Sequence, residues 1–202
     1  MLLYHSPTSP FVRKVMATAH HLGLADSIEC RRGQPSPVKP DPVLSADNPL
    51  GKVPAAALPD GTLLADSRSI CEWLASQGKD PGYLPAPGPA RWPVLELHAL
   101  GDGILDAAVQ SRYETAVRPQ ALFWPEWRAG QMAKIDATIA RLNALTDRLA
   151  GPLTLGSVTV GCALGYLDLR FGDHDWRSAN PRLAIWWAAF DETDAMARTR
   201  PV

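Results

Sequence analysis

Three short stretches in the first half of the chain carry hydroxyl, charged and proline residues at spacings that suit chemistry at the ends of helices and strands. They are "SPTSPFVRKV" from Ser6, "NPLGKVP" from Asn48 and "ADSRSI" from Ala65. Helix N-termini bind anions because they offer free backbone N–H groups and a positive dipole end. An exposed strand end can instead pair with an extended peptide. Each stretch therefore suits either a ligand site or the simple start of a helix or strand.

The first stretch places a hydroxyl at a helix start. Pro10 suits the first helical position, which makes Ser9 the N-cap, at the positive end of the helix dipole. A hydroxyl donor at this position favours a thiolate, and would lower a thiol pKa by about one to two units from about 8.5. Thr8 and Ser6 lie close enough to compete for this role. A helix cap without chemistry also explains Ser9.

The second stretch suggests a peptide-docking loop. A cis bond between Val53 and Pro54 would turn the preceding backbone outward, so that Val53 offers its N–H and C=O to an extended peptide. Lys52 lies alongside as a point charge for a carboxylate. The alternative is an ordinary loop with a trans proline and a solvated lysine.

The third stretch suggests a clamp for a zwitterion. If a helix starts near Ser67, its free N–H groups and its hydroxyl can bind a carboxylate, while Asp66 accepts from an amino group. The alternative is that Asp66 or Ser67 only caps the helix. A further alternative is that Ser69 caps the helix and forms a capping box with Glu72, three residues later.

The elements that hold these stretches alternate between strand and helix. Residues 1–5 suit a buried strand, and the apolar spacing from Val12 to Leu22 predicts a helix that stops at Gly23. A second strand is expected at 27–32, followed by a proline-rich irregular segment. Residues 53–66 predict a hairpin around Asp60 and Gly61, and a helix that ends at Gly78 follows. This half is predicted to be α/β.

Beyond a proline- and glycine-rich segment at 78–93, the periodicity is helical only. Three apolar stripes, from Leu97 to Ala108, from Met132 to Leu149 and from Val160 to Phe171, predict a bundle. A last short helix is expected at Pro181, capped by Asn180. We therefore predict two domains, at 1–78 and 91–202, joined by a linker at 79–90.

Composition excludes several classes of protein. The chain has 202 residues, 46% hydrophobic content, seven tryptophans and a formal net charge of −1, which suits a folded globular protein and not a nucleic-acid partner. No stretch approaches the roughly 20 apolar residues that cross a bilayer, so we expect no membrane span, no signal peptide and a cytoplasmic protein. The three cysteines, Cys30, Cys71 and Cys162, lack metal-like spacing and are expected to be reduced, buried and inert.

The element order and the three stretches together resemble the cytosolic, bacterial-type glutathione S-transferases over nearly the whole chain. "SPTSPFVRKV" is similar to the family's thiol-activating turn, "NPLGKVPAAAL" to its thiol-docking loop, and "LADSRSICEWL" to its γ-glutamyl clamp, in the same order and spacing. The resemblance implies a thioredoxin-like domain of order β-α-β-α-β-β-α that binds glutathione. It also implies an all-α domain that shapes the pocket of the second substrate.

The resemblance also implies roles for individual residues. Ser9 would be the catalytic hydroxyl that stabilises the thiolate of glutathione. Its binding partners would be Lys52, Val53, Asp66 and Ser67. The family more often has Glu where this chain has Asp66, and its C-terminal helix usually begins with Ser or Thr followed three residues later by Asp. In this chain Thr159 is followed by Cys162 instead, which weakens that signal.

The expected activity is conjugation of glutathione to small electrophiles by a homodimeric transferase that uses glutathione as cosubstrate and no metal. Arg112 and Tyr113 are candidates for the second-substrate pocket. Two alternatives remain: a glutathione-binding protein of the same fold with little turnover, and a glutathione-dependent reductase or peroxidase. Mixed-disulfide chemistry is disfavoured because position 9 is a serine and not a cysteine. The sequence does not specify the electrophile.

Overall fold

The computed structural model describes residues 1–201, which fall into two compact units. One unit comprises Met1–Leu84 together with the C-terminal segment from Asp194, and the other comprises Pro85–Thr193. None of the helices in this described part is long and apolar enough to cross a membrane.

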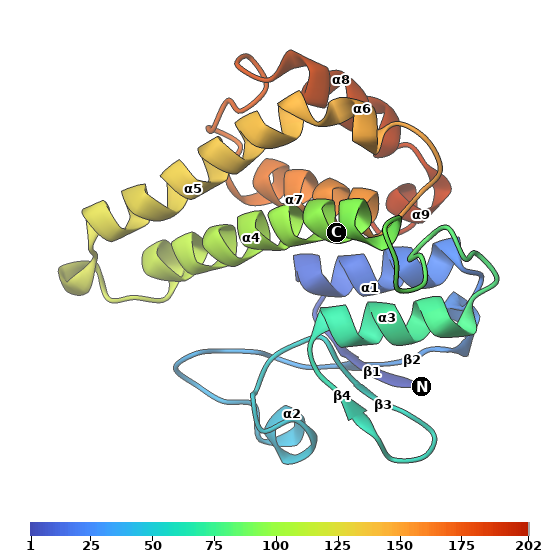
Figure 1. Ribbon diagram of the computed structural model, residues 1–202. Helices are drawn as coiled ribbons and strands as arrows, with labels where there is room; N and C mark the ends of the chain where they lie inside the picture. The colour runs from blue at the N-terminus through green and yellow to red at the C-terminus, as the bar shows by residue number, and fades with distance from the viewer. Residues whose placement is uncertain (202) are drawn as a thin grey trace. The chain divides into compact units, whose positions relative to one another are not determined.

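The first unit is α/β, as predicted, and its elements follow the order β-α-β-α-β-β-α (Figure 1). These elements are β1 (Leu2–His5), α1 (Pro10–His21), β2 (Glu29–Arg32), α2 (Pro42–Asp47), β3 (Ala55–Ala57), β4 (Leu63–Leu64) and α3 (Ser67–Gln77), with a 3-10 turn at Ala25–Ser27. A last short helix, α9 (Asp194–Ala197), joins this unit.

The sheet has the strand order β2-β1-β3-β4. β2 runs parallel to β1, whereas β3 is antiparallel to both β1 and β4. Leu3 and Tyr4 point to opposite faces of β1, and both are buried, so both faces of this strand are covered. α1 and α3 pack side by side against the sheet (Figure 1).

Local signals in the first unit placed its helix and turn boundaries correctly. α1 ends at His21 and is followed by Gly23 at φ +70°, a left-handed conformation that glycine adopts without a steric penalty. The predicted hairpin turn is present, where Leu58 N–H donates to Thr62 C=O over 2.9 Å. α3 ends at Gln77 with Gly78 as its C-cap.

α9 packs on α1, and Arg13 Nη2 of α1 donates to Met196 C=O over 3.2 Å. The segment from Asp194 therefore belongs to the first compact unit, whereas the predicted boundaries group all of 91–202 together. The first unit extends to Leu84, within the predicted linker at 79–90.

The second unit is all-α, as predicted. Its helices are α4 (Arg91–Ala116), α5 (Pro125–Ala144), α6 (Thr146–Leu149), α7 (Leu155–Arg170) and α8 (Pro181–Phe190), with a 3-10 turn at Gln120–Leu122. α7 is buried on all sides from Leu155 to Leu167, so it is the central helix of the bundle. α4 packs along it (Figure 1).

The start of α7 corrects one expectation. Thr154, and not Thr159, is its N-cap, and it forms a capping box with Ser157: Ser157 N–H donates to Thr154 Oγ1 over 3.1 Å, and Thr154 N–H donates to Ser157 Oγ over 2.9 Å. Thr159 instead lies in the second turn, where its hydroxyl donates to Leu155 C=O. The expected signal is therefore present five residues earlier, with serine in the place of aspartate.

Candidate functional site

Three strand ends meet at one edge of the sheet. β1 leads out to the Ser9 turn, β3 begins after Val53, and β4 leads out to Asp66. Because β3 is antiparallel to β1 and to β4, the end of β1, the start of β3 and the end of β4 lie on the same side. Adjacent strands are about 4.8 Å apart, so these three points span about 10 Å, the reach of a short extended peptide. The sheet topology thus brings together the N-terminal site residues that the sequence predicts.

Ser9 is the N-cap of α1, and its hydroxyl oxygen accepts the Val12 N–H over 3.3 Å. Its backbone N–H donates to Ser6 C=O over 3.1 Å, which closes the turn after β1. The hydroxyl hydrogen of Ser9 has no acceptor within residues 1–201. As a cap, Ser9 therefore uses its oxygen as an acceptor and keeps its O–H to donate to a neighbouring anion.

Thr8 and Ser6 lie in the same turn and are partly buried, as Ser9 is. Of the three, Ser9 alone occupies the N-cap position of α1. The helix dipole therefore favours an anion beside Ser9 more than beside the other two hydroxyls.

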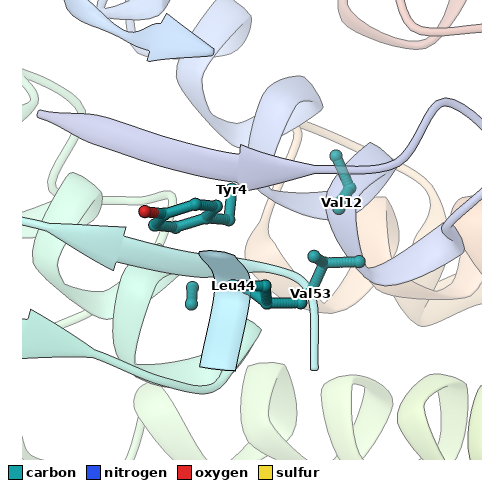
Figure 2. Packing of buried hydrophobic residues seen from close by; sticks show 5 residues of the cluster. Tyr4, Val12, Leu44 and Val53 are labelled. Atoms are coloured by element: carbon teal, nitrogen blue, oxygen red, sulfur yellow. The ribbon is translucent and has the colours of Figure 1, made fainter. Parts of the chain in front are cut away.

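The Val53–Pro54 bond is cis, as the sequence predicted. The ladder between β1 and β3 ends at the pair Tyr4–Ala55, so the backbone of Val53 lies just beyond the last registered pair. Its side chain is buried, at 8% exposure, in a cluster with Tyr4, Val12, Leu44 and Ala55 (Figure 2). The side chain thus anchors the loop, and the backbone groups of Val53 remain at the strand end, where an extended peptide could pair with them.

Val53 also packs against the backbone of the segment that follows β2. A Cβ atom placed on Gly33 would lie only 3.1 Å from Val53 Cγ1. Gly33 N–H in turn donates to His5 C=O over 2.8 Å, one residue after the β1–β2 pairing ends. The loop that carries Val53 is therefore held by the sheet on more than one side.

Asn48 was not singled out from the sequence, yet it organises the docking loop. It is buried, at 1% exposure. Its Oδ1 accepts the Leu50 N–H over 3.2 Å, and its Nδ2 donates to Lys52 C=O over 2.9 Å. Gly51, at φ +61°, completes this turn by donating to Asn48 C=O over 2.9 Å. The Asn-Pro pair at 48–49 was the available signal, because such pairs favour turns.

Tyr4 ties the same loop to the sheet from the other side. Its hydroxyl donates to the Asp47 carboxylate at the end of α2, and it accepts from Arg31 Nη1 of β2 over 3.2 Å. The hydrogen bond to Asp47, with burial, raises the pKa of Tyr4 above its ordinary value, so Tyr4 stays a donor. Strand β1, strand β2 and helix α2 are thereby joined beneath the loop.

Asp66 and Ser67 occupy the start of α3. Asp66 is the N-cap, and its carboxylate accepts the Arg68 N–H over 2.8 Å, while the residue itself is exposed. Ser67 is the first helical residue and is 2% exposed. The Ala65–Asp66 peptide bond is cis. Asp66 therefore caps α3, and its residue remains exposed to solvent.

Comparison with known proteins concerns the whole chain and not only this edge. A model of the glutathione S-transferase N-terminal domain matches residues 8–77, and a model of the C-terminal domain matches residues 125–189. The uncharacterized GST-like protein YibF of Escherichia coli K12 is 31% identical over 204 residues, covering 100% of this chain and 98% of that protein. The chain belongs to the glutathione S-transferase family.

Solved structures of glutathione transferase family members agree with this assignment. One from Pseudomonas fluorescens Pf-5, with bound glutathione, is 43% identical with a TM-score of 0.97, covering 100% of this chain and 98% of that one. Another from the same organism, with bound S-(propanoic acid)-glutathione, is 41% identical with a TM-score of 0.93, covering 100% of both chains.

The remaining candidates are one residue beside this sheet edge and two in the second unit. Lys52 is exposed on the docking loop, whereas Arg112 and Tyr113 belong to the last turns of α4, in the second unit. In the part of the chain that the structure describes, no group of three or more His, Cys, Asp or Glu side chains could hold a metal ion.

The cysteines are free, as their spacing predicted, but one burial prediction is wrong. Cys71 and Cys162 are buried, whereas Cys30 is exposed on β2. β2 is an edge strand whose four residues are all exposed, so strand position alone did not imply burial. Desolvation of the sulfur still raises the pKa of Cys30, which disfavours a reactive thiolate.

Proposed function

We propose that this protein is a glutathione transferase that conjugates the thiolate of glutathione to small electrophiles. The observation that carries the proposal is the full-length likeness to family members crystallised with glutathione and with S-(propanoic acid)-glutathione. The second ligand is a thioether of glutathione, the class of compound that conjugation produces. The sheet edge where β1 ends, β3 begins and β4 ends spans about 10 Å, which is the length of a short extended peptide such as glutathione.

Each part of glutathione has a partner of suitable chemistry at this edge. Val53 pairs through its backbone with the cysteinyl residue, as an added strand would. Lys52 meets the glycine carboxylate as a point charge. The first turn of α3, with Ser67, binds the γ-glutamyl carboxylate, and Asp66 accepts from the γ-glutamyl amino group.

Ser9 acts on the sulfur of glutathione. The Ser9 oxygen caps α1 by accepting the Val12 N–H, and the Ser9 O–H donates a hydrogen bond to the thiolate. The positive end of the α1 dipole also favours the thiolate. The thiol proton leaves to solvent, the sulfur attacks the electrophilic carbon, and the leaving group departs with its electron pair. Ser9 forms no covalent bond in this scheme, and it stabilises a nucleophile that the cosubstrate supplies.

The test combines calorimetry with a substrate panel. We expect glutathione to bind, and 1-chloro-2,4-dinitrobenzene to give a glutathione thioether identified by mass spectrometry. Binding without thioether formation would assign the chain to glutathione-binding proteins with little turnover. Turnover only of a disulfide or a hydroperoxide would assign it to the reductase or peroxidase alternative.

We further propose a cytoplasmic protein that forms a homodimer, since the family resemblance implies a dimer. Light scattering at micromolar concentration measures the oligomeric state. Cell fractionation tests the location.

A further inference from the structure

Tyr4 of β1 holds the docking loop, residues 48–54, near both of its ends. The ring of Tyr4 is buried, at 1% exposure, in the cluster that also contains the side chain of Val53 (Figure 2). The hydroxyl of the same side chain donates to the carboxylate of Asp47, the residue directly before the loop. One side chain of the sheet therefore fixes the chain before the loop and lies beside the residue that is expected to pair with a peptide.

The sheet and Arg31 fix the direction of the Tyr4 hydroxyl. Tyr4 and Arg31 are partners in the register of β1 and β2, so their side chains lie on the same face of the sheet. Arg31 Nη1 donates to the Tyr4 hydroxyl over 3.2 Å, and the guanidinium carbon lies 5.6 Å from the centroid of the ring. Because Arg31 can only donate, the single hydrogen of the hydroxyl is directed at Asp47.

Asn48 and Tyr4 have different tasks in the loop. Asn48 shapes the loop from within, since it accepts the N–H groups of Leu50 and Gly51 and donates to Lys52 C=O. Asn48 directly follows Asp47 in the chain, so a displacement of Asp47 would move this set of hydrogen bonds as a whole. The bond from Tyr4 to Asp47 therefore sets the position of the loop relative to β1.

We propose that Tyr4 is a positioning residue for glutathione, because its hydrogen bond to Asp47 holds the docking loop in the conformation that pairs with the cysteinyl part of the peptide. This inference rests on the proposed function, in which Val53 and Lys52 bind glutathione. A loop that is already held in its bound conformation loses less conformational freedom when the ligand binds. The hydroxyl of Tyr4 should therefore act on glutathione affinity and not on the chemical step at Ser9.

Tyr4→Phe removes the hydroxyl and keeps the buried ring. Asp47 and Arg31 are exposed, so water can replace their lost partner, and we expect the variant to fold. Calorimetry should show glutathione binding about 3- to 10-fold more weakly, the value of one hydrogen bond. With 1-chloro-2,4-dinitrobenzene as electrophile, the KM for glutathione should rise by the same factor, while kcat at saturating glutathione stays the same. A role in stability alone would lower Tm and leave this KM unchanged.

Variants of Asp47 test whether Tyr4 acts through this carboxylate. Asp47→Ala removes the acceptor and should weaken glutathione binding as much as Tyr4→Phe does. The double variant should bind no more weakly than either single variant, because both remove the same hydrogen bond. Asp47→Asn should recover most of the affinity, since its amide oxygen still accepts from Tyr4. Losses of affinity that add in the double variant would overturn the inference.

Tyr83 offers a matched control in the first unit. It is fully buried, and its hydroxyl lies 2.6 Å from the Oγ1 of Thr18 in α1. Tyr83→Phe therefore also removes a buried tyrosine hydroxyl, and should lower Tm while glutathione affinity stays at the wild-type value. Equal weakening of binding by Tyr83→Phe and Tyr4→Phe would overturn the inference, because the loss of any buried hydroxyl would then suffice.

Amide hydrogen exchange of the protein without glutathione measures the order of the loop directly. We expect the N–H groups of Leu50 and Gly51 to exchange about 3- to 10-fold faster in Tyr4→Phe, and at the wild-type rate in Tyr83→Phe. Unchanged exchange in Tyr4→Phe, or unchanged glutathione affinity, would overturn the inference while the proposed function stands. If the wild-type protein does not bind glutathione, the proposed function fails, and this inference fails with it.

Discussion

The side chains of Val12 and Val53 lie in one buried cluster, although Val12 belongs to the first turn of α1 and Val53 precedes β3 (Figure 2). This contact holds the turn of Ser9 and the docking loop against each other. It therefore links the packing of the core to the geometry in which glutathione would be held.

Truncation of Val53 should affect both stability and binding. Val53→Ala removes two buried methyl groups and should lower the free energy of unfolding by about 1.5–3 kcal/mol. Because the loop backbone would also shift, we expect glutathione to bind about five-fold more weakly, the value of roughly one hydrogen bond. Denaturant unfolding measures the loss of stability, and calorimetry measures the loss of glutathione affinity. Val15→Ala is the control, since Val15 is fully buried in α1 outside this cluster; an equal loss of affinity there would argue against a local effect.

Asp66→Asn separates the cap of α3 from the charge that binds an amino group. Asparagine caps a helix about as well as aspartate, so stability should change little. Loss of the charge should weaken glutathione binding by about 10-fold or more. Asp41→Asn is a close match, because Asp41 is the N-cap of α2 and accepts from Val43 and Leu44 in the same way. Calorimetry measures the glutathione affinity of both variants. If Asp66→Asn binds glutathione as tightly as the wild type, Asp66 serves only as a helix cap.

Asn48 positions the docking loop through two side-chain hydrogen bonds, so Asn48→Ala should cost about 1–3 kcal/mol of stability. We also expect weaker glutathione binding, because Lys52 and Val53 lose their support. Asn180→Ala removes another buried asparagine, which donates to Trp176 C=O in the second unit, and should leave glutathione affinity unchanged. If both variants bind glutathione like the wild type, Asn48 has no positioning role.

Asp168 should make stability depend on pH in the acid range. Burial alone would raise the pKa of Asp168, but hydrogen bonds from Arg177, Trp187 and Trp176 outweigh it, so the pKa lies below the ordinary value of 3.8. The folded state therefore binds fewer protons than the unfolded state. The stabilisation is complete above about pH 4 and is lost as the pH falls through the lowered pKa. Thermal melting between neutral and acid pH should show a shallower acid loss for Asp168→Asn than for the wild type, and identical slopes would contradict this role.

Local signals made much of the fold predictable, together with the local conformation at the candidate site of the first unit. Pro10 after Ser9, Val53 before Pro54, and Gly23 and Gly78 at helix ends each act through the conformation of one or two residues. The start of α7 was misplaced because Thr159 lies within the helix, and the hydrogen bonds between Thr154 and Ser157 show where the cap is.

Features that depend on contacts between distant segments were not predictable. The link from Tyr4 to Asp47 and Arg31 joins three elements. The pairing of Arg148 with Glu96 and of Arg177 with Asp168 joins residues from different turns and helices. A single sequence holds no record of such pairing, because many arginines and acids are available and only the packing of the helices selects among them.

Ser9→Ala separates the cap of α1 from the stabilisation of the thiolate. Loss of the cap should cost about 0.5–2 kcal/mol of stability, which a domain of this size should tolerate. Loss of the hydrogen bond to the thiolate should raise the barrier by about 2–3 kcal/mol, a fall of roughly 30- to 150-fold in turnover. Glutathione affinity should barely change. Thr154→Ala, which removes the N-cap of α7, should lower stability without this loss of turnover.

The pKa of the thiol of bound glutathione tests the central claim most directly, and it can be followed by the ultraviolet absorbance of the thiolate as the pH is raised. In the wild-type protein we expect this pKa to lie about one to two units below that of a free thiol. In Ser9→Ala it should rise toward the free value, whereas Thr154→Ala should leave it where the wild type has it. An unshifted thiol pKa together with full turnover in Ser9→Ala would contradict the account, and would move the thiolate contact to Thr8 or Ser6.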